Sequence, residues 1–126
     1  MNKDESSGSA SVDSQLLELQ KEYVASLPAR LVPVMASWQC CVDSNYAADL
    51  LQEVYRAVHA IAGTSSMLNV TPVNELSNKA QELIHGLMAA DDMDAERLLD
   101  LGKTLKTLES VILAGKVKAP PINLHG

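Results

Sequence analysis

The strongest candidate for chemistry in this sequence is His59, within the stretch Val54–Asn69 (VYRAVHAIAGTSSMLN). An imidazole has an ordinary pKa of about 6.5, so a neutral ring with a nucleophilic nitrogen is available at pH 7. Residues of a helix follow one another at about 100°, and the apolar residues here fall opposite His59. They are Leu50, Val54, Ala57, Ile61 and Leu68. The pattern predicts a helix that buries one face and holds the imidazole out in water.

The residues that share the predicted exposed face with His59 are mostly small or polar. They are Ala48, Gln52, Tyr55, Arg56, Ala62, Gly63 and Ser66. Gly63 lies one turn after His59, and a glycine inside a helix costs roughly 1 kcal/mol compared with alanine. Close approach by another molecule would explain a glycine at this position. We therefore expect this face to contact a partner. Neither Arg56 nor Ala62 is expected to face the core.

Two other residue pairs could do chemistry, but each has a simpler explanation. Glu82 and His85 form a Glu-x-x-His pair, which di-iron four-helix bundles use twice, whereas this chain has it once. Cys40 and Cys41 are adjacent, a spacing that gives only a strained disulfide and lacks the two intervening residues of redox or zinc motifs. The sequence also contains no Gly-rich phosphate loop. We therefore expect no metal site, reduced thiols and no independent enzyme active site.

Helix-forming residues and helix boundaries account for almost the whole chain, and no strand-like alternation occurs. The expected helices cover residues 14–26, 28–42, 44–68, 72–90 and 95–114. Pro28 separates the first two, which could be two helices or one bent helix. Short connections favour antiparallel neighbours. The prediction is an all-α, antiparallel up-down four-helix bundle with an additional N-terminal helix or helix extension. Residues 1–12 are expected to be a flexible leader, residues 13–115 the bundle domain and residues 116–126 a flexible tail.

The composition limits the kinds of partner. The chain has 126 residues, enough for one domain, and 47% are hydrophobic without a single Phe, which predicts an aliphatic core. A formal net charge of −6 argues against nucleic-acid binding. No apolar run approaches the length of a membrane span, and the start of the chain is polar and acidic. We expect a cytoplasmic protein without a membrane partner.

The stretch around His59 resembles the histidine-containing phosphotransfer (HPt) domains of bacterial two-component phosphorelays. The family motif is His-x-x-Lys-Gly on an exposed helix, followed by small residues, an apolar position and a Gly. His59 and Gly63 match the motif, Asn69 stands at the later Gly, and Ala62 replaces the Lys. With the run from Leu16 to Arg30 and the helix after Asn69, the resemblance covers about residues 13–115.

The resemblance implies that His59 accepts a phosphoryl group from a receiver-domain aspartate and passes it to another receiver. The transfer would be stoichiometric and would need no kinase activity of this chain's own. The implied partners are response-regulator receiver domains and a hybrid sensor kinase. No cofactor is expected on this chain, since the receiver would bring the Mg²⁺, and a monomer would suffice.

Two alternatives remain open. One is a phosphorylation-incompetent docking module that binds and sequesters a receiver domain, and the other is a plain helical adaptor. Ala62 lacks the charge that the family places near the phosphoryl group, which favours the first alternative, whereas the second requires only amphipathic helices.

Arg56 lies about 60° from His59 around the helix, and Ala62 lies about 60° away on the other side. Arg56 could therefore supply the missing charge, or it could be an ordinary surface charge that pairs with Glu53 or Gln52.

Overall fold

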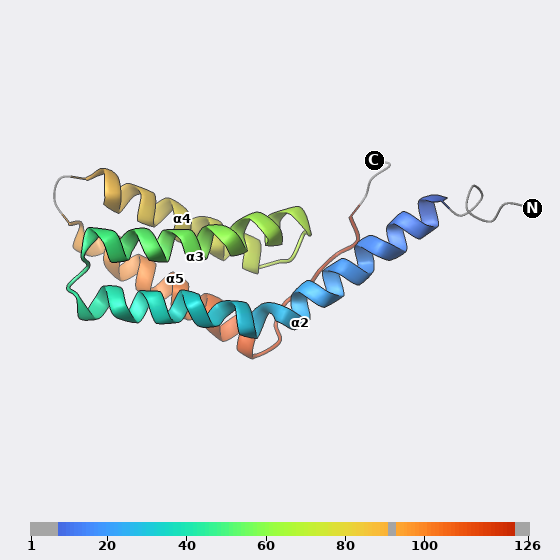
Figure 1. Ribbon diagram of the computed structural model, residues 1–126, viewed down its shortest axis with the longest axis horizontal. Coiled ribbons are helices and arrows are strands. Elements are labelled where there is room, and N and C mark those ends of the chain that lie inside the picture. Colours follow the sequence, from blue (N-terminus) through green and yellow to red (C-terminus); the bar gives the residue numbers. More distant parts are fainter. Residues whose placement is uncertain (1–7, 91–92, 123–126) are drawn as a thin grey trace, which may run out of the picture.

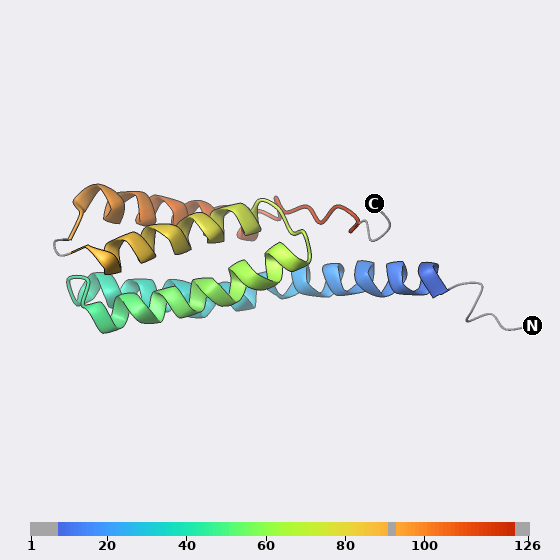
Figure 2. The same cartoon turned by 90° about the horizontal axis from the view of Figure 1, so that it is seen from above.

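The computed structural model describes residues 8–90 and 93–122, and helices make up most of this part of the chain (Figure 1). The helices are α2 (Gly8–Asp43), α3 (Ala48–Met67), α4 (Val73–Ala89) and α5 (Ala95–Leu113). Contacts join α2 to α3, α3 to α4, α4 to α5 and α5 back to α2. Consecutive helices run in opposite directions (Figures 1 and 2). The prediction of an all-α, antiparallel four-helix bundle is confirmed.

The N-terminal extension is part of the first helix and not a separate element. Helix α2 is 36 residues long and includes Pro28 and Pro33 in its interior. Its first half projects beyond the end of the bundle, and Figure 1 shows that the two halves run in different directions, as expected where proline interrupts the backbone hydrogen bonds. The predicted leader begins outside the described residues, at 1–7. Its remaining residues, 8–12, are helical, so the predicted leader was too long.

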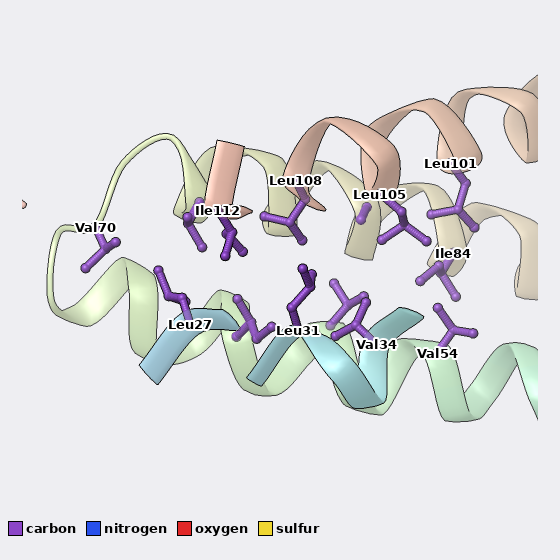
Figure 3. Packing of buried hydrophobic residues seen from close by; sticks show 14 of the residues in the cluster. Leu27, Leu31, Val34, Val54, Val70, Ile84, Leu101, Leu105, Leu108 and Ile112 are labelled. Carbon is purple, nitrogen blue, oxygen red and sulfur yellow. The ribbon is translucent and has the colours of Figure 1, made fainter. Parts of the chain in front are cut away.

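The core is aliphatic, as the absence of Phe predicted. Leu27, Leu31 and Val34 of α2 point across the bundle toward the leucines of α5 (Figure 3). Those leucines and the residues that close the cluster are all buried: Leu101, Leu105, Leu108, Ile112, Val54, Ile84 and Val70. Packing of these side chains supplies the main favourable term for the bundle and holds α3 against both α2 and α4.

The connections between helices follow the sequence signals in part. Asn69 (φ 55°) and Gly115 (φ 69°) adopt the left-handed conformation that ends a helix, and Asp94 accepts hydrogen bonds from two backbone N–H groups at the start of α5. Helix α3 begins at Ala48, later than the predicted 44, because the chain turns with positive φ at Asn45 and Tyr46.

The segment 116–122 packs on the bundle, whereas a loose tail was predicted. The backbones of Lys118 and Thr71 exchange two hydrogen bonds of 2.8 Å. The Nε2 atom of Gln20, a buried side chain of α2, donates to the carbonyl oxygens of Pro120 and Leu68, each at 2.8 Å. These contacts are long-range in sequence, which explains why composition alone suggested a free tail. The last predicted tail residues, 123–126, lie outside the described residues.

Within residues 8–90 and 93–122, none of the helices combines the length and the apolar character that crossing a bilayer requires.

Candidate functional site

His59 lies on the exposed face of α3, and its ring is fixed by a residue of α4. The Nδ1 atom of His59 lies 2.6 Å from Oε1 of Gln81. An amide oxygen only accepts hydrogen bonds, so this contact requires the proton of the neutral ring on Nδ1. The lone pair then resides on Nε2. His59 therefore presents a nucleophilic nitrogen on the surface of the bundle.

Gln81 was missed by the sequence analysis, although a signal for it exists. Helices α3 and α4 are antiparallel neighbours joined by a short turn, so residues at equal chain distance from the turn face each other. His59 and Gln81 lie eleven residues before and eleven residues after Val70. Pairing the two helices about the predicted turn would have brought Gln81 beside His59.

Tyr55 and Gln52 occupy the turns of α3 that precede His59, and both are half-buried. The ring of Tyr55 is nearly parallel to the imidazole, with an interplanar angle of 11° and 5.8 Å between the ring centroids. Tyr55 also packs against the hydrophobic core. Tyr55 thus packs against one face of the His59 ring, while Gln81 restricts the ring through the hydrogen bond to Nδ1.

Gly63 and Ser66 extend the surface on the turns of α3 that follow His59. Gly63 is exposed, and a Cβ atom added there would meet nothing within 4 Å. Ser66 is exposed, and its Oγ accepts a hydrogen bond of 2.9 Å from Nδ2 of Asn78 on α4. The surface of α3 is consequently open at Gly63, one turn after His59.

The position of Ala62 corrects the sequence analysis. Ala62 was expected on the exposed face, but its side chain is only 3% exposed. Helix α3 packs against both α2 and α4, so its buried sector is wider than one stripe and also includes Val58 and Ser65. A pattern of large apolar residues alone marks only part of that sector, because alanine and serine at a close helix contact carry no strong signal.

Arg56 is exposed and pairs with a neighbour on its own helix. Its Nη1 atom lies 2.7 Å from Oε1 of Glu53, and the two side chains are 67% and 53% exposed. This is one of the two arrangements that the sequence left open. Such exposed pairs typically contribute about 0.2–1 kcal/mol, so the guanidinium is held weakly.

A hydrophobic hollow lies between α2 and the C-terminal end of α3. Met67 is 70% exposed and Leu19 50% exposed, and both line this hollow of about 280 Å³ together with Arg30 and Thr64. We call the lining of this hollow, which includes the exposed Leu19 and Met67, the α2–α3 surface. Large exposed apolar side chains that line a hollow favour protein docking.

The remaining candidate residues belong to no metal-binding cluster in the described part of the chain. Glu82 and His85 are both exposed, and residues 8–90 and 93–122 contain no cluster of three or more His, Cys, Asp or Glu that could hold a metal ion. Cys40 and Cys41 are free thiols. Burial, with a smaller effect from Asp49, raises the pKa of the Cys41 thiol, so this cysteine is a poor nucleophile.

Comparison with known proteins identifies the family of this chain. The family model of the Hpt domain matches residues 10–115, which include the whole of α3, α4 and α5. No curated protein and no solved structure matches the chain. Since the match covers most of the chain, the chain belongs to the Hpt domain family.

Proposed function

We propose that this protein is a phosphorelay intermediate in which His59 accepts a phosphoryl group from a receiver-domain aspartate and passes it to another receiver domain. Membership of the Hpt family supports a role in two-component phosphorelays. The observation that carries the assignment to His59 is its contact with Gln81, which leaves Nε2 free on an open surface.

The chemistry follows from the protonation state of the ring. The Nε2 lone pair attacks the phosphorus atom of the aspartyl phosphate, the N–P bond forms, and the P–O bond to the aspartate breaks. The bonding electrons leave with the aspartate, which becomes a carboxylate. The imidazole becomes positively charged, and Gln81 Oε1 stabilises that charge through the Nδ1 proton. In the onward step a second aspartate attacks the same phosphorus and Nε2 recovers its lone pair.

The surroundings of His59 suit a reaction that depends on positioning. Phosphoryl transfer needs alignment and charge neutralisation more than covalent help from this protein. Tyr55 and Gln81 restrict the ring, and the open space at Gly63 lets a partner approach. In this proposal the receiver domain docks on the α2–α3 surface and supplies the aspartate and the Mg²⁺, and a hybrid sensor kinase feeds the relay in the cytoplasm.

The charge distribution supports a second candidate. Helix α3 contains one Arg and no Lys, and Arg56 is occupied by Glu53. If the phosphoryl group found no positive partner, the same fold would serve as a docking module that binds and sequesters a receiver domain without accepting phosphate. The docking surface is the same in both candidates, so only phosphorylation distinguishes them.

Incubation with a receiver domain that carries radiolabelled aspartyl phosphate tests the proposal. We expect label on this protein that is acid-labile and base-stable, as in phosphohistidine. His59→Gln should abolish it, whereas His85→Gln, which removes an exposed histidine of α4, should retain it. Label that persists in His59→Gln would overturn the proposal, and tight binding without label would favour the docking module.

A further inference from the structure

The charges around Nε2 of His59 are unevenly distributed. The α4 side chains that hydrogen-bond to this part of α3 are the neutral Gln81 and Asn78. On α3 itself, from Ala48 to Met67, the sole Lys or Arg is Arg56. A phosphoryl group on His59 would carry roughly two negative charges, and the nearest basic side chain along the helix would be Arg56.

The orientation of the imidazole ring directs Nε2 toward the side of the helix that carries Arg56. Gln81 holds Nδ1 on the side of α4, and the two nitrogens of an imidazole point in nearly opposite directions. Arg56 lies one turn before His59, a spacing at which side chains on a helix are neighbours. It is exposed, whereas Ala62, on the other side of His59, is buried.

Arg56 is at present directed toward Glu53 and not toward His59. The contact is an exposed i,i+3 pair, which is weak and screened by salt. A phosphoryl group offers three acceptor oxygens and a higher charge than a carboxylate, and it matches the two parallel N–H groups of a guanidinium. The phosphoryl group should therefore compete successfully with Glu53.

We propose that Arg56 binds the phosphoryl group of phosphorylated His59 and that Glu53 holds Arg56 away while His59 is unphosphorylated. On phosphorylation the guanidinium exchanges the Glu53 carboxylate for phosphoryl oxygens, and no covalent bond changes in this step. Glu53 thereby lowers the share of phosphoryl group that stays on this protein and favours onward transfer. This inference rests on the proposed function of His59.

The equilibrium between phosphorylated receiver and phosphorylated His59 tests this proposal. A guanidinium that binds the phosphoryl group stabilises the phosphorylated protein relative to the free protein. Arg56→Ala should therefore lower the equilibrium share of label on His59 by up to about fivefold, the upper end of the range of an exposed charge pair. The effect should shrink in high salt. Lys106→Ala, which removes an exposed basic residue from an i,i+3 pair on α5, is the matched control and should change nothing.

Glu53→Gln should shift the same equilibrium in the opposite direction, toward phosphorylated His59. Its effect should be smaller in the Arg56→Ala background, where there is no guanidinium to release. An equal effect in both backgrounds would reduce Glu53 to a simple repelling charge and overturn its holding role. Normal labelling with an unchanged equilibrium in Arg56→Ala would overturn the role of Arg56 alone. Absence of label in the unmodified protein would instead overturn the proposed function.

Discussion

Gln81 accepts a hydrogen bond from Nδ1 of His59 across the interface between α4 and α3, at 2.6 Å. Two helices thus cooperate in one reactive group: α3 carries the nucleophile, and α4 selects its tautomer. The register of the α3–α4 hairpin therefore matters for chemistry as well as for packing. A shift of α4 by one residue would turn Gln81 away from the ring by about 100°.

Replacing Gln81 by Leu should slow phosphoryl transfer to His59. Leucine fills a similar volume but accepts no hydrogen bond, so the ring loses its fixed tautomer and the stabilisation of its developing charge. One such bond contributes about 0.5–1.5 kcal/mol, which corresponds to a two- to tenfold slower transfer. Single-turnover labelling would measure the rate. Lys79→Ala, an exposed change on the same helix, is the control, and equal rates in all three proteins would contradict the role of Gln81.

The fold could be predicted from the sequence to a large extent, because helix-forming residues, caps and turns all agree. Asn69, Asp94 and Gly115 stop or start helices by local backbone chemistry, which sequence reveals directly. The packing of the tail against Gln20 could not be predicted in this way. It depends on contacts between residues 100 positions apart, which no local pattern encodes.

The candidate site was predictable where it depends on one helix and less so where it depends on two. His59 and Gly63 lie on one exposed face, as their spacing indicated. Ala62 was placed wrongly because the width of a buried sector depends on how many neighbours a helix has. Gln81 lies 22 residues from His59 and becomes visible only when the two helices are paired.

Gly63 offers a test that separates packing from docking. A Cβ atom at Gly63 meets nothing within 4 Å, so Gly63→Ala should raise the free energy of unfolding, by up to about 1 kcal/mol, through higher helix propensity. Gly63→Leu should also leave the bundle folded, but it should weaken receiver binding by filling the open surface. Urea unfolding and a binding titration measure the two effects. A Leu variant that unfolds would show that Gly63 is needed for packing.

Because the thiol of Cys41 is buried, we expect the folded protein to lose stability in alkaline solution. Burial, assisted by Asp49, raises the pKa of its thiol in the folded protein, while the unfolded chain ionises near the ordinary value of about 8.5. Above that pH the unfolded state binds fewer protons than the folded state, so stability falls as the pH rises toward the folded pKa. The contribution is fully retained below about pH 8. Cys41→Val should lose less stability between pH 8 and pH 10 in urea titrations, and parallel losses in both proteins would contradict this explanation.

Ala62→Lys would restore the basic residue of the family motif, but the structure predicts that the change also affects the fold. The Ala62 side chain is 3% exposed on a helix that packs against two neighbours, so a longer side chain must push between helices or bend its stem out to water. We expect the free energy of unfolding to fall by about 1–3 kcal/mol. Ala60→Lys, two residues earlier on the exposed face, should change it by less than about 0.5 kcal/mol. Urea unfolding of both variants is the measurement. If Ala62→Lys were as stable as Ala60→Lys, the lysine stem would have a free path to the surface. A lysine at position 62 could then compensate for the loss of Arg56 in an Arg56→Ala background.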